Sequence, residues 1–162
     1  MSNVITIKKK ISNFNKTIKV SGDKSISIRW VLFSSLAKGV SKAKNLLVLD
    51  DVLAAISAVN KLGIKSEIKK NECKIFGKGI NGYQYKKNLI INAENSGTLG
   101  RLILGLLINS SQKIKLIGDK SLSKRDFKRV SDPLSKFGAK FKLNKNKNLP
   151  LTLIGCSNPR SI

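Results

Sequence analysis

A glycine turn, a lysine and two serines stand together near the start of the chain, in residues 22–29 (GDKSISIR). The apolar spacing that follows predicts a helix, and the first backbone N–H groups of a helix are unpaired while its dipole end is positive. A phosphate there can accept bonds from these N–H groups, from Ser25 and from the cations Lys24 and Arg29. The octet therefore predicts an anion-binding helix start, although an ordinary serine N-cap beside a solvated lysine has the same letters.

A second helix start, in residues 95–101 (NSGTLGR), offers similar chemistry. Gly97 has no side chain, so an anion can approach the backbone closely at this point. Arg101 either points to such a ligand or supports the loop. A glycine-and-serine cap without any ligand is also compatible with the motif, which taken alone does not decide between these interpretations.

A cationic stretch occupies residues 120–129 (KSLSKRDFKR). Its composition is compatible with an RNA contact. Its position, after a predicted strand and at the start of a predicted helix, favours a small anion, because Arg125 could bind a carboxylate or phosphate through two parallel hydrogen bonds. The letters GDKS recur at residues 118–121, but after a different strand, so we interpret this identity as partly accidental.

Apolar spacing predicts the elements that must position these groups. Helices are expected over residues 25–36, 52–62, 98–109 and 124–137. Strands are expected over residues 4–7, 18–20, 43–47, 64–68, 73–76, 113–117, 139–143 and 151–154. Gly39 and Gly63 are placed as C-terminal caps, Asp50 and Asp51 as an N-cap, and Pro133 as a disturbance in the last helix.

The order helix, strand, helix, strand, strand occurs twice, which indicates an internal repeat. Its clearest mark is KLGIK at residues 61–65 against KFGAK at residues 136–140. The repeat predicts an α/β domain in which like units bury the apolar faces of their helices against one another. Because the chain stops directly after a predicted strand, we expect it to be a fragment.

Composition leaves several classes of partner open. The net charge is +23, from 32 Lys and Arg against 9 Asp and Glu, which is compatible with nucleic acid, an acidic membrane or small anions. The lysines are scattered and aromatic residues are few, so most lysines are expected to be solvated surface. The longest apolar stretch, residues 102–108, is too short to span a bilayer, and the N-terminus lacks a secretory apolar region, so we expect a cytoplasmic protein.

The two cysteines, Cys73 and Cys156, are isolated, and the chain has no histidine. A metal centre is therefore not expected, and the cysteines are interpreted as buried thiols in a reducing compartment.

Taken in this order, the motifs resemble the 5-enolpyruvylshikimate-3-phosphate (EPSP) synthase family over nearly the whole chain. The resemblance is carried by residues 22–29, 95–101, 45–63 (NLLVLDDVLAAISAVNKLG) and 118–139 (GDKSLSKRDFKRVSDPLSKFGA). A sister family that acts on a UDP-amino sugar shares the fold but lacks the GDKSIS-x-R pattern. Two departures occur, because Ser21 stands where proline is common and Ile28 where His or Asn is common.

The resemblance implies an α/β fold of repeated βαβαββ units, an inside-out α/β barrel, with three units in each of two domains. This chain would supply an incomplete part of one domain: a leading strand region at about residues 1–20, a first unit at about 21–80 and a second at about 81–162. The remainder of the enzyme would be absent.

The resemblance also implies a reaction, the transfer of a carboxyvinyl group from phosphoenolpyruvate to the 5-hydroxyl of shikimate 3-phosphate on the route to chorismate and the aromatic amino acids. Lys24, Ser25 and Arg29 would hold shikimate 3-phosphate. Lys24, Gly97 and Arg125 would hold phosphoenolpyruvate. The acid and base groups would lie beyond residue 162, so the chain alone is expected to be inactive. No cofactor or metal is implied, and the parent is expected to be a monomer with no specific nucleic-acid partner and no membrane partner.

Two alternatives remain at this point. A basic nucleic-acid-binding module would bind nucleic acid in a salt-sensitive way. A structural module would melt cooperatively without any response to shikimate 3-phosphate.

Overall fold

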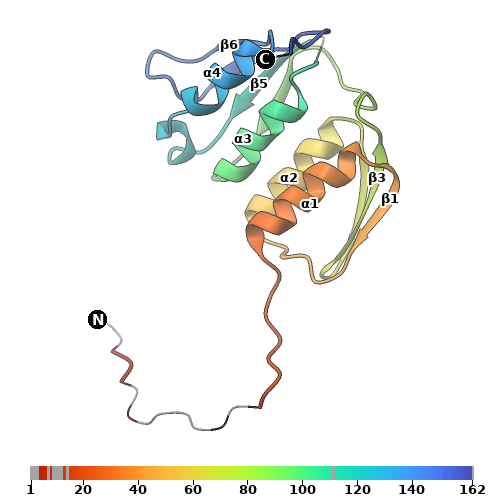
Figure 1. Cartoon of the computed structure of the whole chain (residues 1–162), viewed down its shortest axis with the longest axis vertical. Helices are drawn as coiled ribbons and strands as arrows, with labels where there is room; N and C mark the ends of the chain where they lie inside the picture. The colour runs from red at the N-terminus through yellow and green to blue at the C-terminus, as the bar shows by residue number, and fades with distance from the viewer. Residues whose placement is uncertain (1–3, 7, 9–12, 14, 111, 162) are drawn as a thin grey trace.

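The structure is a computed structural model of the chain, and it describes residues 4–6, 8, 13, 15–110 and 112–161 (Figure 1). Its first half contains α1 (Lys24–Leu36), β1 (Lys38–Ala43), α2 (Asp50–Lys61), β2 (Lys65–Lys69) and β3 (Glu72–Lys78). Its second half contains β4 (Leu89–Asn92), α3 (Gly97–Leu106), β5 (Lys113–Ile117), the 3-10 helix η1 (Leu122–Lys124), α4 (Lys128–Lys136), β6 (Lys140–Lys142) and β7 (Leu151–Ile154).

The two halves build sheets of related topology. The first sheet has the order β1-β3-β2 and is antiparallel, and the second has the order β4-β5-β7-β6. β5, β7 and β6 pair as β1, β3 and β2 do, while β4 joins β5 in parallel as a fourth strand. The repeated order of elements predicted from the sequence is thus present, with β4 as an addition that apolar spacing did not predict.

The helices share one hydrophobic core. Ile28, Val31 and Leu32 of α1 are buried in the same cluster as Ile103 of α3 and the completely buried Phe127. α1 packs against both α2 and α3, and each sheet lies on the outer side of the helices of its own half (Figure 1). This packing fixes the starts of α1, α2 and α3 relative to one another.

Local backbone geometry explains where several elements begin and end. Gly63 follows α2 with φ +82°, the left-handed conformation that closes a helix, as expected. Gly39 does not cap α1, because α1 ends at Leu36 with Ala37 as its C-cap, and Gly39 lies inside β1. The strand expected at residues 43–47 accordingly lies earlier in the chain, at Lys38–Ala43.

The helix expected over residues 124–137 is shorter and is preceded by η1. The carboxylates of Asp119 and Asp126 accept hydrogen bonds from the N–H groups of Leu122 and Lys128, both at 2.6 Å. Such side-chain bonds compete with a continuous helix, so α4 begins only at Lys128. Pro133 lies inside α4, and the third helix ends at Leu106 rather than at residue 109.

The leading strands are not present in the described residues. Val4, Ile5, Ile18 and Val20 are 83%, 87%, 73% and 70% exposed, and none belongs to a strand. An extended segment becomes a strand only when a neighbouring strand pairs with its backbone groups, and these residues have no such neighbour among those described. Ile7, part of the same prediction, lies outside the described residues.

The two cysteines differ in burial. Cys73 is buried in β3, and burial raises the pKa of its thiol, whereas Cys156 is partly exposed, so the prediction of buried thiols is correct for Cys73 alone. In the part of the chain that the structure describes, no helix combines the length and the apolar character needed to cross a membrane.

Candidate anion-binding site

The starts of three helices meet at one cavity of about 310 Å³. Lys24 is the first residue of α1, Asp51 lies in the first turn of α2, and Gly97 is the first residue of α3. The cavity is lined by Lys24, Asp51, Asn95, Gly97, Thr98, Arg101 and Arg125. With three cationic side chains, one carboxylate and the positive ends of helix dipoles, this cavity suits an anion.

The turn before α1 places Lys24 at the cavity. Asp23 is the N-cap of α1, and its carboxylate accepts the N–H of Ile26 at 2.6 Å, so the cap is not Ser25. Gly22 passes so close to the next loop that a Cβ would collide with the backbone oxygen of Asn45. A glycine is therefore needed here for the approach of two backbone segments, and the turn fixes the direction of Lys24.

Lys24 is held by an acidic partner from α2. Its Nζ lies 3.0 Å from Oδ2 of Asp51, with side-chain exposures of 52% and 19%. An ion pair this exposed contributes little to stability, so its main effect is to restrict where the ammonium group lies. The sequence predicts Asp50 and Asp51 as an N-cap, but the N-cap residue is Leu49, which makes no side-chain capping bond. Asp51 instead forms the ion pair with Lys24.

At the start of α3, two guanidinium groups flank a glycine. Ser96 caps the helix by accepting the N–H of Leu99 at 3.3 Å. A Cβ added to Gly97 would lie 2.9 Å from Nη1 of Arg125 and 3.0 Å from Nη1 of Arg101. No side chain at Gly97 fits without displacing these groups, so the glycine keeps the helix start accessible between them.

Arg125 is positioned by the loop after β5. Its Nη2 donates to Oδ1 of Asn95 at 3.2 Å, and it directly follows η1. The turn into η1 is held by Asp119, which accepts the N–H three residues later at 2.6 Å, just as Asp23 does before α1. The two GDKS segments therefore share a local hydrogen-bonding role, and their identity is less accidental than the sequence indicated.

The structure brings together only part of the predicted site. Lys24, Gly97 and Arg125 line the same cavity, as expected of three residues assigned to one ligand. Ser25 and Arg29 lie on the first two turns of α1 but do not line this cavity; Ser25 is partly buried and Arg29 is exposed.

Comparison with known proteins identifies the family. The family model described as EPSP synthase (3-phosphoshikimate 1-carboxyvinyltransferase) matches residues 8–160. The chain belongs to the EPSP synthase family. The 3-phosphoshikimate 1-carboxyvinyltransferase of Bacillus cytotoxicus is 44% identical over 77% of this chain and 29% of its own length. That of Streptococcus suis is 40% identical over 96% of this chain and 37% of its own length.

Solved structures agree with the sequence matches. EPSP synthase from Acinetobacter baumannii superimposes with a TM-score of 0.83 and 31% identity, covering 90% of this chain and 33% of that protein. The predicted fold class is therefore confirmed as the α/β fold of EPSP synthases, present here in part. The chain spans about a third of the length of the relatives it matches.

Three of the residues that line the cavity of this EPSP synthase family member are not predicted as anion ligands by the sequence motifs. The motif at residues 95–101 contains Asn95 and Thr98 but predicts no ligand contact for them, and Asp51 is predicted only as a helix cap. No local pattern reports that Asp51 reaches Lys24 or that Asn95 reaches Arg125, because each pair lies far apart along the chain. The sequence indicates only that Asp51, Asn95 and Thr98 lie at or just before the start of a helix.

An adjoining cavity of about 740 Å³ shares Asp51 and Asn95 with the anion-binding cavity and also contains Asp50, Glu94 and Asp119. Among the described residues, no group of three or more His, Cys, Asp or Glu side chains is arranged to hold a metal ion. The acidic side chains of the adjoining cavity border the anion-binding cavity on the side of Asp51 and Asn95.

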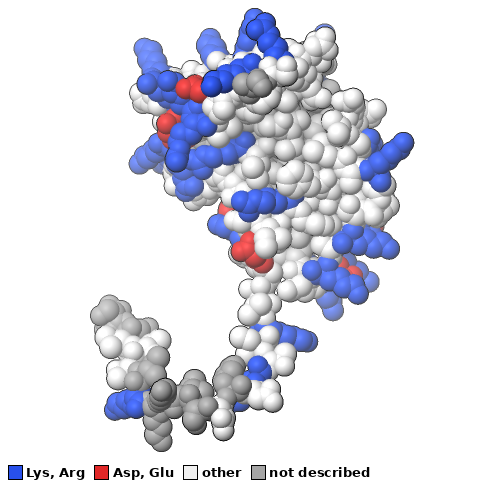
Figure 2. Space-filling model, viewed as in Figure 1, with Lys and Arg blue, Asp and Glu red and all other residues white. Residues whose placement is uncertain are grey.

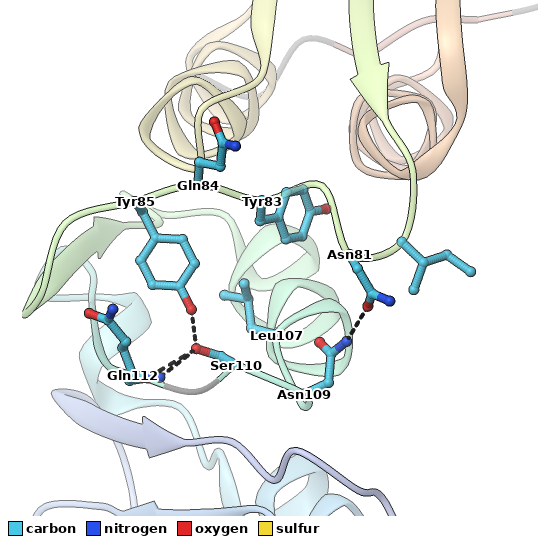
Figure 3. Close-up of a pocket in the computed structure, with 9 residues that line it drawn as sticks. Asn81, Tyr83, Gln84, Tyr85, Leu107, Asn109, Ser110 and Gln112 are labelled. Atoms are coloured by element: carbon cyan, nitrogen blue, oxygen red, sulfur yellow. Dashed lines mark hydrogen bonds between the residues drawn. The ribbon is translucent and has the colours of Figure 1, made fainter.

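A further cavity, of about 430 Å³, lies at the opposite end of α3 between the β3–β4 connection and the loop after α3 (Figure 3). The hydroxyls of Tyr85 and Ser110 are hydrogen-bonded, and Nδ2 of Asn109 donates to Oδ1 of Asn81 at 3.1 Å. Burial raises the pKa of Tyr83, whose hydroxyl bonds to Ser35. The described residues that line this cavity are uncharged.

Proposed function

We propose that this chain supplies part of the substrate site of a 3-phosphoshikimate 1-carboxyvinyltransferase. In that reaction the 5-hydroxyl oxygen of shikimate 3-phosphate adds to C2 of phosphoenolpyruvate while C3 gains a proton. The C2–O bond to phosphate then breaks, C3 loses a proton, and inorganic phosphate and the enolpyruvyl product result. The observation that carries the proposal is the cavity in which Lys24, Gly97 and Arg125 meet at two helix starts.

These residues would hold phosphoenolpyruvate by its negative charges. Arg125 offers a planar pair of donors, and its bond to Asn95 restricts its orientation before any ligand arrives. Gly97 leaves the first N–H groups of α3 accessible, and Lys24 adds a positive charge from the side of α1. Groups already oriented in this way bind charge without reorganising, which is the condition for stabilising a charged transition state.

Shikimate 3-phosphate is assigned to the neighbouring surface of α1. Arg29 follows Ser25 by four residues, so the two side chains lie on the same face of the helix, with Lys24 beside them. The hydroxyl of Ser25, the two cations and the helix start together suit a phosphate group. Lys24 would then contact both substrates and lie between their reacting ends.

The remaining parts of the proposal concern what lies around this site. The acid and base groups would come from residues outside this chain, so the 162-residue chain should bind substrates without converting them. The reaction needs no cofactor or metal from these residues. The proposed compartment is the cytoplasm, as the sequence predicts. We propose that the complete protein is a monomer with no specific nucleic-acid partner and no membrane partner.

The test combines binding with turnover. Isothermal titration of the chain at low salt should detect phosphoenolpyruvate and shikimate 3-phosphate, with phosphoenolpyruvate bound more tightly than sulfate. Arg125→Gln should weaken phosphoenolpyruvate binding about tenfold or more, because one charge-assisted pair of bonds is lost. Arg129→Gln, the same charge change on the exposed face of α4, should alter it less than about twofold.

Two results would count against the proposal. Absence of binding for both substrates would remove the assigned function. Robust phosphate release from the two substrates by the isolated chain would show that the catalytic groups lie within residues 1–162, contrary to their proposed location.

A further inference from the structure

Arg101 is directed at the same point as Arg125, although the sequence left its role undecided. It lies one turn after Gly97 in α3, and helical side chains lean toward the start of their helix. Its Nη1 is 3.0 Å from the position that a Cβ of Gly97 would occupy, while Nη1 of Arg125 is 2.9 Å from that position. Two guanidinium groups therefore face one helix start from two sides.

The guanidinium of Arg101 lies over an aromatic ring. Its Cζ lies 5.6 Å from the centroid of Phe127, which is completely buried. A guanidinium over a ring interacts through its face, so its N–H groups, which lie at the edge, remain available as donors. Within the described part of the chain, no hydrogen bond or ion pair engages the guanidinium of Arg101.

The convergence of two guanidinium groups needs a physical explanation. Like charges a few ångströms apart repel one another, and solvent screens the half-buried Arg101 less than the exposed Arg125. The carboxylate in the cavity does not relieve it, since Asp51 pairs with Lys24, and the bond from Arg125 goes to the neutral amide of Asn95. A bound anion between the two arginines would remove the repulsion.

We propose that Arg101 is a direct anion ligand of this cavity and binds, together with Arg125, a phosphoryl group seated against the start of α3. Two forked donors and the unpaired N–H groups of α3 match the three peripheral oxygens of a phosphoryl dianion. The identification of that group as the phosphoryl group of phosphoenolpyruvate rests on the proposed function. The capacity to bind a phosphoryl dianion does not.

The alternative is that Arg101 only covers Phe127. A structural role would affect thermal stability and leave affinity unchanged, whereas a ligand role affects affinity and the magnetic environment of the guanidinium. The two are separable by titrating the isotopically labelled 162-residue chain with inorganic phosphate and with phosphoenolpyruvate. Affinity, the Arg101 Nε–Hε signal and the melting temperature would be measured together.

With the wild type, the Arg101 signal should shift on titration with either probe. Arg101→Gln should weaken both affinities about tenfold or more, since a charge-assisted interaction is lost. Arg101→Lys keeps the charge but lacks the planar fork of donors, so its affinities should lie between those of the wild type and Arg101→Gln. Arg129→Gln on α4, which removes the same charge outside the cavity, should change affinity less than about twofold.

The outcomes separate this inference from the proposed function. Two results would overturn the role of Arg101 and leave the proposed function standing. In the first, the wild type binds phosphoenolpyruvate but its Arg101 signal does not shift. In the second, Arg101→Gln binds phosphoenolpyruvate as tightly as the wild type does. Phosphate binding that depends on Arg101, without preference for phosphoenolpyruvate, would support the inference and count against the proposed function. A wild type that binds neither probe would overturn both. If Arg101→Gln does not fold, the shift of the wild-type Arg101 signal and the affinity of Arg101→Lys test the role of Arg101.

Discussion

The residue that says most about the cavity is one without a side chain. A Cβ added at Gly97 would lie 3.0 Å from Nη1 of Arg101 and 2.9 Å from Nη1 of Arg125, in the space that the two side chains share. Both guanidinium groups would have to shift, and the methyl group would occupy space beside the first N–H groups of α3. The backbone of α3 does not itself require a glycine here, so what the glycine preserves is the space between the two arginines.

Gly97→Ala should therefore separate binding from stability. We expect phosphoenolpyruvate affinity to fall about tenfold or more, because the cations are displaced. Stability should stay the same or rise by up to about 1 kcal/mol, because alanine is a better helix former than glycine. Calorimetric titration and urea unfolding of the same samples would measure the two effects.

Gly105 in the same helix provides a matched control. A Cβ there would meet no atom within 4 Å, so Gly105→Ala should stabilise the chain by about 0.5–1 kcal/mol and leave phosphoenolpyruvate affinity unchanged. Equal binding by Gly97→Ala and Gly105→Ala would show that no ligand lies against the start of α3.

At this scale, the sequence predicted the residues that occupy helix starts but not the partners that orient them. That Lys24, Gly97 and Arg125 line one cavity could be expected, because loop-to-helix motifs have a direct relation to anion binding, and their contact with a ligand stays a prediction. Asp51 and Asn95 could not, since their contacts depend on how α2 and the loop before α3 pack beside their neighbours. Tertiary packing, which no local motif encodes, brings Asp51 to Lys24 and Asn95 to Arg125.

Among the elements, α1 shows how a cap can serve both folding and the site. Asp23 satisfies the N–H of Ile26 and fixes the residue that follows it, Lys24. Asp23→Ala should lower the free energy of unfolding by about 1 kcal/mol, the typical contribution of an N-cap side chain. It should also weaken phosphoenolpyruvate binding modestly, since the first turn of α1 would fray.

Denaturant unfolding with a matched variant tests the cap. Asp23→Asn keeps an acceptor at the N-cap and should restore most of the stability that Asp23→Ala loses. If Asp23→Ala unfolded at the same urea concentration as the wild type, the carboxylate bond to Ile26 would not be what starts α1.

The predictability of the elements follows from the strength of their local signals. α2 and the strands β5 and β7 begin and end at or near the expected residues, because strong apolar periodicity and clear turn residues agree. β4 has only four residues and was not predicted. The expected helix at residues 124–137 begins late because Asp119 and Asp126 bond to the backbone, an effect that apolar periodicity does not report.

At the scale of the whole molecule, a small anion-binding cavity has to be reconciled with a large net positive charge. Figure 2 shows Lys and Arg in several separate groups, around α4, along the edge formed by β1 and β3 and on the N-terminal segment, with a broad uncharged surface between them. On this face the cations do not form one continuous track. A specific nucleic-acid surface would instead present a continuous basic groove with stacking aromatics.

Nucleic-acid binding by this chain should therefore be general and salt-sensitive. With 32 cationic residues, the chain should bind a mixed-sequence oligonucleotide at low salt through counterion release, and this affinity should fall steeply as salt rises. Different sequences should bind alike. Fluorescence anisotropy across a salt series, with several oligonucleotide sequences, measures both properties.

Arg125→Gln connects this prediction to the cavity. Removing one of 32 cations should change oligonucleotide affinity less than about twofold, because scattered phosphate contacts share the interaction. The same substitution should weaken phosphoenolpyruvate binding about tenfold or more, because a site of seven lining residues depends on each oriented donor. Sequence-selective oligonucleotide binding that survived physiological salt and required Arg125 would reverse this conclusion, since the cavity would then serve a nucleic-acid phosphate rather than a small substrate.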